Sequence, residues 1–75
     1  MLEKIRDIMT RYVDLDPEEI REDSKLAEEL GLTSFAVMSM MGDFEEEFGF
    51  FFNDTATTEI YTVKDIMNYI EKKQG

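Results

Sequence analysis

Apolar residues recur at three- and four-residue spacing in three segments of the chain, which is the pattern of an amphipathic helix. The segments span residues 2–13, 34–48 and 63–73. Their expected inner faces are formed by Leu2, Ile5, Ile8, Met9, Tyr12 and Val13, by Val37, Met40 or Met41, Phe44 and Phe48, and by Val63, Ile66, Met67 and Ile70. The pattern predicts an all-α fold, a small up-and-down helical bundle of three main helices.

The ends of these helices carry local signals. The first helix is expected to end near residue 14, because a proline disfavours helical geometry in the residue before it and Pro17 follows. Thr33 or Ser34 would cap the second helix. Thr62 is expected to cap the third, with Asp65 as its capping-box partner.

Residues 15–33 lack helical spacing and are predicted to form a long first loop. A turn over residues 25–30 would be capped by Asp23 or Ser24 and ended by Gly31. The residues spaced to hold the loop against the core are Ile20, Leu26, Leu30 and Leu32. So long a loop in so small a domain is typical of a functional segment.

Residues 53–62 differ from the rest of the chain. Asn53 or Asp54 would cap one short helix over residues 54–60, although the threonine-rich sequence has poor helix propensity. The segment NDTATTEIYT is also the in-frame translation of AAT GAT ACG GCG ACC ACC GAG ATC TAC AC, a common sequencing adapter, with the last codon completed as threonine. We hypothesise that it entered from an adapter-containing read. Resequencing of the source locus tests this, and an ordinary genomic sequence for these residues would refute it.

Length and charge limit the possible functions. The 75 residues allow one domain, residues 1–75, and the net charge is −10 from 18 acidic and 8 basic side chains. Such a charge excludes nucleic acid and anionic membranes as expected ligands and favours partners with basic patches. The chain has no Cys and no His, which excludes thiol nucleophiles, histidine acid–base chemistry and the usual zinc sites. No metal site is expected. Because the chain has no long apolar run and no signal-peptide pattern, it is expected to be cytoplasmic. It is also expected to be a monomer.

Ser34 is the residue that could carry chemistry. A serine at a helix start is usually only a cap. Here it lies within LGLTSF (residues 30–35), ahead of a helix that ends in FEEEF (44–48). The segments DPEEI (16–20), SKLAEEL (24–30) and TVKDI (62–66) flank it in a fixed order and spacing. Over essentially the whole chain this resembles the acyl carrier protein family, whose attachment motif is Asp-Ser-Leu.

The resemblance implies a carrier rather than an enzyme, with three main helices plus one short helix. A phosphopantetheinyl transferase would move 4′-phosphopantetheine from coenzyme A to Ser34, where the helix N-terminus favours an anion. The arm would then hold acyl groups as thioesters in fatty-acid or related polyketide biosynthesis. The residues expected to meet the transferase and the acyl-processing enzymes are Phe35, Met38, Glu45 and Glu46. The methionines that could line an acyl cavity, or simply fill the core, are Met9, Met38, Met40, Met41 and Met67.

Some positions depart from the family pattern. Thr33 replaces the usual Asp, Ala36 a frequent Asp and Ser39 a frequent Glu, which removes negative charge where a basic transferase would dock. Gly42 replaces a larger partner-facing residue. Three alternatives stay open from the sequence: a D-alanine carrier, an unmodified acidic helical adaptor that only binds partner proteins, and an inward-folded Phe35 with no docking role.

Overall fold

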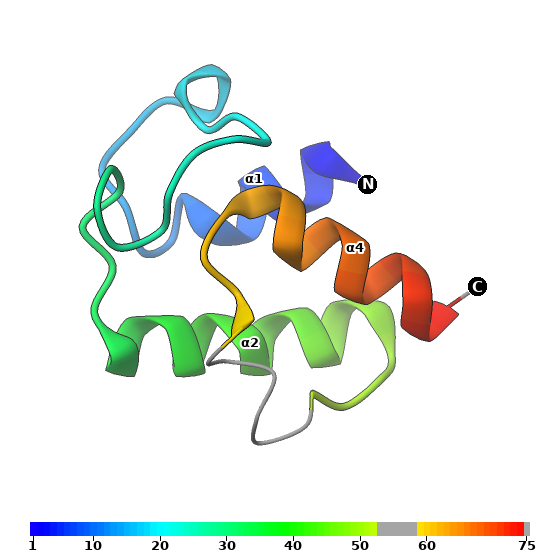
Figure 1. The fold of residues 1–75 in the computed structure, drawn as a ribbon. Helices are drawn as coiled ribbons and strands as arrows, with labels where there is room; N and C mark the ends of the chain where they lie inside the picture. Colours follow the sequence, from blue (N-terminus) through cyan, green and yellow to red (C-terminus); the bar gives the residue numbers. More distant parts are fainter. Residues whose placement is uncertain (53–58, 75) are drawn as a thin grey trace.

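The computed structural model describes residues 1–52 and 59–74 and contains three α-helices there. These are α1 (Leu2–Met9), α2 (Ser34–Phe48) and α4 (Val63–Gln74), with a 3-10 turn, η1, over Pro17–Glu19 (Figure 1). The described residues form no strand, and their β-type pairing is an isolated bridge between Lys25 and Thr62. The predicted all-α fold is confirmed, and the predicted ranges of α2 and α4 are correct to within one residue. The predicted short helix over 54–60 falls almost wholly outside the described residues.

α1 ends earlier than predicted. Its last residue is Met9, whereas the apolar pattern continues to Val13. Beyond Met9 the backbone tightens, since the Arg11 N–H donates to the Ile8 carbonyl and the Tyr12 N–H to the Met9 carbonyl, each three residues back. Val13 remains buried, and its N–H still donates to Met9. The apolar spacing therefore predicted the burial correctly and the helix end wrongly.

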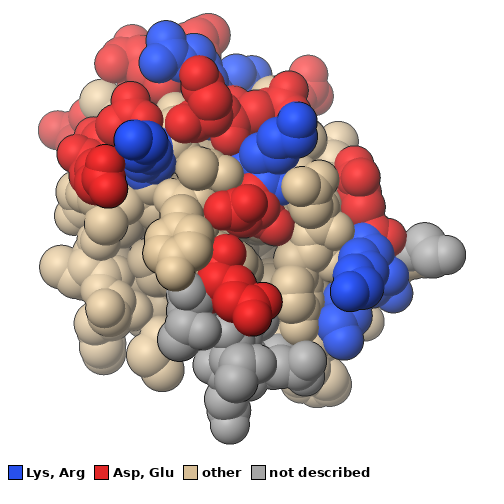
Figure 2. Space-filling view, in the orientation of Figure 1, with Lys and Arg blue, Asp and Glu red and all other residues tan. Residues whose placement is uncertain are grey.

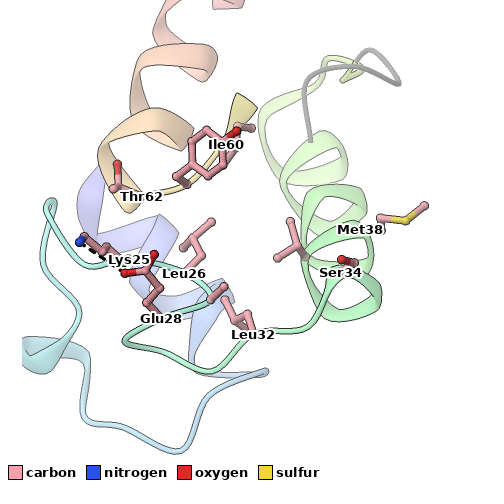
Figure 3. A pocket seen from close by; sticks show the side chains of 11 residues that line it. Lys25, Leu26, Glu28, Leu32, Ser34, Met38, Ile60 and Thr62 are labelled. Atoms are coloured by element: carbon pink, nitrogen blue, oxygen red, sulfur yellow. Dashed lines mark ion pairs between the residues drawn. The ribbon is translucent and has the colours of Figure 1, made fainter. Parts of the chain in front are cut away.

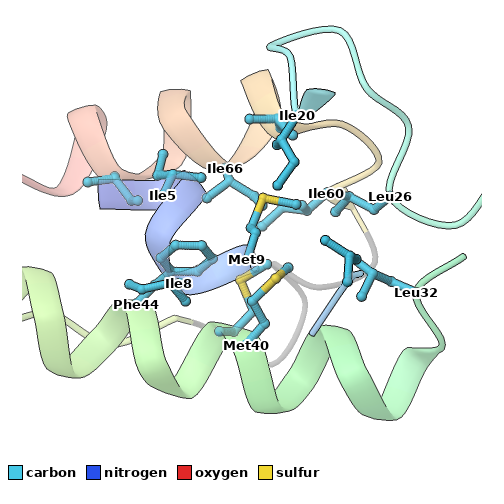
Figure 4. Close-up of a cluster of buried hydrophobic side chains, with 14 residues drawn as sticks. Ile5, Ile8, Met9, Ile20, Leu26, Leu32, Met40, Phe44, Ile60 and Ile66 are labelled. Carbon is cyan, nitrogen blue, oxygen red and sulfur yellow. The ribbon is translucent and has the colours of Figure 1, made fainter. Parts of the chain in front are cut away.

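The core lies between the three helices. α1 runs in the opposite direction to α2 and α4 (Figure 1). Each helix contributes one buried face, and residues of the first loop complete the core. Figure 4 shows its most buried part, which includes Ile5, Ile8, Met9, Ile20, Met40, Phe44 and Ile66. Ile20, Leu26 and Leu32 are buried, as the sequence predicted for anchors of the loop.

The first loop is hydrogen-bonded to the start of α4. The Leu26 N–H donates to the Tyr61 carbonyl at 2.8 Å, the Val63 N–H to Ser24 at 3.1 Å, and the Lys64 N–H to Glu22 at 2.8 Å. These bonds satisfy backbone groups that would otherwise lie unpaired near the core. They also place residues 24–26 of the loop against residues 61–63.

The turn over residues 25–30 forms as predicted and ends at Gly31, whose φ of 69° lies in the left-handed region that favours glycine. Its predicted cap is wrong. The buried Ser24 hydroxyl accepts a hydrogen bond from the Arg21 N–H at 2.9 Å, so it closes the preceding turn. The carboxylate of Glu29 instead accepts from the Lys25 N–H at 2.9 Å.

Candidate functional site

Ser34 is the first residue of α2, and its side chain is exposed. The residue before it caps the helix: Thr33 has extended backbone geometry, and its hydroxyl accepts a hydrogen bond from the Ala36 N–H at 3.1 Å. Of the two cap candidates in the sequence, Thr33 is thus the one that caps. Because the cap does not depend on the Ser34 hydroxyl, that hydroxyl can be modified without loss of this hydrogen bond.

The residues just before Ser34 fix its position. Gly31 turns the chain, and Leu32 is 6% exposed, so its side chain anchors the backbone two residues before the serine. The Leu32 N–H also donates to the Leu26 carbonyl at 2.9 Å. An anchored residue on one side and a capped helix on the other hold Ser34 at a defined place on the surface.

A pocket of about 540 Å³ lies beside Ser34, between α2 and the segments that the first loop and residues 60–62 contribute (Figure 3). Its apolar lining includes Leu26, Leu32, Val37 and Ile60, and Ser34 itself lies on the α2 side. This volume falls in the range of ligand sites, and a mainly apolar lining with few polar groups is typical of them. The pocket can therefore shelter an apolar group attached near Ser34.

A charged pair lies on the opposite side of this pocket. Nζ of Lys25 is 3.4 Å from Oε2 of Glu28, and both residues contribute to the lining (Figure 3). The pair is largely exposed, so its effect on stability is small. Neither residue could be assigned to a site from the sequence, because only the folded loop brings them to face α2. Ile60, Tyr61 and Thr62, which also line the pocket, belong to the adapter-like segment.

Of the methionines considered as cavity residues, only Met38 lines this pocket. Met9, Met40 and Met41 are buried in the core, and Met67 packs against it half-buried. For these four, the interpretation as core filler is the one that the structure supports. Their unbranched side chains fit irregular gaps between helices.

The residues predicted to meet partners do not all share one environment. Phe35 is 79% exposed and Met38 64% exposed, so the alternative in which Phe35 folds inward is wrong. Glu46 is exposed as well. Glu45, by contrast, is half-buried, and its Oε2 accepts a 2.6 Å hydrogen bond from the Phe52 N–H. Glu45 thus holds the chain that follows α2, a role that the sequence did not indicate.

The phenol of Tyr12, in the turn that follows α1, has a shifted pKa. Tyr12 donates a hydrogen bond to Asp43, and this bond, burial and the negative charge of Asp43 raise the pKa of the Tyr12 phenol, while Arg11 partly lowers it. Asp43 lies nine positions after Ser34 on α2. The shift therefore belongs to the packing of α1 on α2 rather than to the surroundings of Ser34.

The surroundings of Ser34 fit a phosphopantetheine arm. The hydroxyl is exposed on the first turn of a fifteen-residue helix, where the helix dipole and N–H groups favour a phosphodiester. The adjoining pocket can accommodate an apolar group carried by such an arm. None of the helices in residues 1–52 and 59–74 is long and apolar enough to cross a membrane.

Comparison with known proteins decides the family. Residues 3–70 match the family model described as a phosphopantetheine attachment site. The acyl carrier protein of Thermotoga maritima is 38% identical over 72 residues, which cover 96% of this chain and 89% of that protein. The acyl carrier protein of Campylobacter curvus is 32% identical over 72 residues, covering 96% and 94%.

The chain belongs to the acyl carrier protein family. It is therefore a carrier protein rather than an enzyme, and its prosthetic group is a covalently attached 4′-phosphopantetheine. A solved structure of the acyl carrier protein from Enterococcus faecalis superposes with a TM-score of 0.80 at 25% identity, covering 95% of this chain and 90% of that one. This agreement confirms the small all-α fold and the resemblance on which the sequence interpretation rested.

Proposed function

We propose that Ser34 carries the 4′-phosphopantetheine of this acyl carrier protein. The observation that supports this most directly is the position of its exposed hydroxyl, on the first residue of α2 and beside an apolar pocket. Ser39, also in α2, is half-buried and does not line the pocket, and Ser24 is buried in the first loop. Ser34 is thus the serine best placed both for a transferase and for a carried group.

The loading reaction requires little of the chain itself. In the transferase, the Ser34 oxygen would form a bond to the β-phosphorus of coenzyme A, adenosine 3′,5′-bisphosphate would leave, and the transferase would accept the hydroxyl proton. The N-terminal dipole of α2 would stabilise the new phosphodiester. When bound, the arm supplies the thiol that this Cys-free chain lacks, and that thiol holds acyl groups as thioesters.

The pocket is the proposed shelter for the carried acyl chain. Leu26, Leu32 and Val37 would contact the methylene groups and remove them from water, worth about 0.8 kcal/mol for each buried CH₂. Cover of this kind would limit exposure of an apolar cargo between enzymes. Fatty-acid biosynthesis, or the related assembly of polyketides, is the proposed pathway, and the cytoplasm the proposed location.

The decisive experiment is intact mass spectrometry after incubation with coenzyme A and a phosphopantetheinyl transferase. We expect the parent chain and the Ser39→Ala control to gain one phosphopantetheinyl group, and Ser34→Ala to gain none. Loading of Ser34→Ala would show that the attachment residue is wrong. An unloaded parent chain would instead favour the unmodified adaptor. Intact mass of the protein purified from its native host would identify the cargo and distinguish an acyl carrier from a D-alanine carrier.

A further inference from the structure

A lysine amine lies on the wall of the pocket beside Ser34. The basic side chains visible in Figure 2 are spread over separate places on the surface rather than gathered in one patch. The chain has five lysines, all in the part that the structure describes, and of these Lys25 is the one that lines the pocket. Ser34 lines the same pocket from the α2 side (Figure 3). A primary amine and the proposed attachment hydroxyl therefore border one space of about 540 Å³.

The backbone of Lys25 is fixed at this wall. Its N–H donates to Oε1 of Glu29 at 2.9 Å, and the residue forms the isolated bridge with Thr62. Its neighbours along the chain, Ser24 and Leu26, are both buried. Lys25 therefore stays beside the pocket, and its flexible four-carbon side chain supplies the reach of the amine.

The amine itself is not locked in place. Nζ of Lys25 lies 3.4 Å from Oε2 of Glu28, in an ion pair whose side chains are 57% and 75% exposed. Exposed pairs of this kind contribute little free energy, so Nζ can leave Glu28 at small cost. Lys25 can thus turn its amine toward a group that is held in the pocket.

A thioester sheltered in this pocket would meet that amine. Lysine amines are nucleophiles toward carbonyl carbon, and an amide is more stable than a thioester, so transfer of an acyl group to nitrogen is favourable. Because the arm and Lys25 belong to one chain, their effective concentration is on the order of mM without any second molecule. Confinement of both groups in one pocket favours the geometry of attack further.

We propose that Lys25 is a self-modification site, at which an acyl group retained on the arm is transferred to Nζ as an amide. This inference rests on the proposed attachment at Ser34. After Nζ has released its ammonium proton to water, the Lys25 amine attacks the thioester carbonyl carbon, a C–N bond forms and the C–S bond breaks. The proton that the nitrogen then loses passes to the sulfur, so the arm regains its thiol. The reaction consumes no further reactant and leaves the mass of the chain unchanged.

The modification would mark chains whose cargo is not collected. An acyl group that a partner enzyme removes promptly does not reach Lys25, whereas a retained one becomes a permanent amide beside the pocket. Acylation also removes one positive charge from a chain whose net charge is already −10. Modified and unmodified chains should therefore differ in mobility on a native gel.

The experiment loads the chain with an octanoylated arm, using octanoyl-coenzyme A and a phosphopantetheinyl transferase, and then removes unreacted reagent. The loaded chain is held at pH ~9, where more of each lysine is present as amine, and sampled over time. Hydroxylamine cleaves thioesters and leaves amides intact, so peptide mapping after this treatment locates the amide. Since the chain has no Cys, any thiol that appears belongs to the arm.

Three variants provide the controls. Lys25→Arg keeps the positive charge and removes the nucleophile. Lys64→Arg is the matched control, because Lys64 is exposed but does not line the pocket. Ser34→Ala, incubated with the same octanoyl-coenzyme A, measures direct acylation of lysine without the arm. Circular dichroism would verify that each variant is folded.

We expect the parent to gain an octanoyl amide at Lys25 and a free thiol with no change in intact mass. Lys25→Arg should lower the amide yield at least about tenfold, since tethering supplies most of the rate, and Lys64→Arg should match the parent. The rate should not depend on protein concentration.

Several results would overturn the inference while loading at Ser34 stands. These are an equal amide yield in Lys25→Arg, an even spread over the five lysines, a rate proportional to protein concentration, and release of the thiol with loss of the octanoyl mass. Equal acylation of Lys25 in Ser34→Ala would overturn it too, because the arm would then be unnecessary. If the parent is not loaded at all, the proposed attachment fails and this inference fails with it.

Discussion

The phenol oxygen of Tyr12 donates a 2.5 Å hydrogen bond to Oδ2 of Asp43, which joins the turn after α1 to the middle of α2. The guanidinium of Arg11 lies 3.6 Å from the same carboxylate oxygen. A neutral phenol can donate this bond, whereas a phenolate beside Asp43 would be repelled. The contact therefore makes the packing of α1 against α2 dependent on the protonation of Tyr12.

The first prediction concerns stability at high pH. Because folding raises the pKa of Tyr12 above its ordinary value of about 10, the stabilisation is fully present below pH ~10 and is lost as pH rises through the folded-state pKa. Tyr12→Phe should lower the free energy of unfolding by about 1 kcal/mol at pH 7 and flatten the decline above pH ~10. Urea unfolding from pH 7 to 11 measures this, with Tyr61→Phe, at an exposed site, as the control. An identical pH profile for parent and Tyr12→Phe would contradict it.

The second prediction separates the cap of α2 from the attachment site. Thr33→Ala removes the hydrogen bond to the Ala36 N–H and should cost about 1 kcal/mol of stability. Ser34→Ala leaves that bond intact, so its melting temperature should stay close to that of the parent while loading is lost. Thermal unfolding of the two variants side by side measures this. Equal losses of stability would mean that Ser34 also caps the helix.

The third prediction distinguishes two adjacent glutamates. Glu45→Lys removes the acceptor for the Phe52 N–H and should destabilise the fold by about 1–2 kcal/mol. Glu46→Lys, at an exposed position, should leave stability within about 0.5 kcal/mol of the parent but slow association with a basic partner at low salt. Chemical unfolding and stopped-flow binding provide the two measurements. The interpretation fails if both variants show the same loss of stability.

The fourth prediction follows from net charge. Among the residues that the structure describes, three carboxylates form ion pairs: Asp43 with Arg11, Asp23 with Arg21 and Glu28 with Lys25. Most of the negative charge behind the net charge of −10 is therefore not offset by a paired basic side chain in this part of the chain. Self-repulsion should therefore lower stability at low salt, and ~0.1 M salt should raise the melting temperature by several degrees through screening. Equal increases in melting temperature with NaCl and with KCl would indicate screening rather than the binding of a specific cation. A flat or falling curve would show that repulsion between carboxylates is unimportant here.

Local signals were sufficient to predict α2 and α4. The bounds of α2 follow from Thr33 as a cap and from Gly49, whose φ of 74° ends the helix. At α4 the predicted capping box is present, because the Asp65 N–H donates to the Thr62 hydroxyl at 3.2 Å and Asp65 accepts from the Thr62 N–H at 3.0 Å. In each case the physical cause lies within four residues of the helix end, where sequence alone can reveal it.

Features that depend on distant segments could not be predicted in this way. The pocket beside Ser34 forms only where the first loop and residues 60–62 lie against α2. The spacing of apolar residues along the chain does not predict this contact between distant segments. The same holds for the chain after α2, where Phe52 stacks on Tyr69 of α4 with ring centroids 4.6 Å apart. An apolar run such as residues 50–52 indicates burial but does not identify its partner. Exposure of Phe35 likewise depends on which face of α2 the core occupies.

The hydrogen bonds between the first loop and the start of α4 have a consequence for local opening. Because the amides of Leu26, Val63 and Lys64 donate across this junction, breaking it exposes all three at once. Their hydrogen exchange should therefore report one shared opening free energy, as expected for a cooperative unit. Two of the walls that surround the pocket would open together in such an event, while α2 stays folded on α1. The rate at which a bulky cargo enters the pocket would then be set by the local opening of this junction rather than by motion of α2, the helix that bears Ser34.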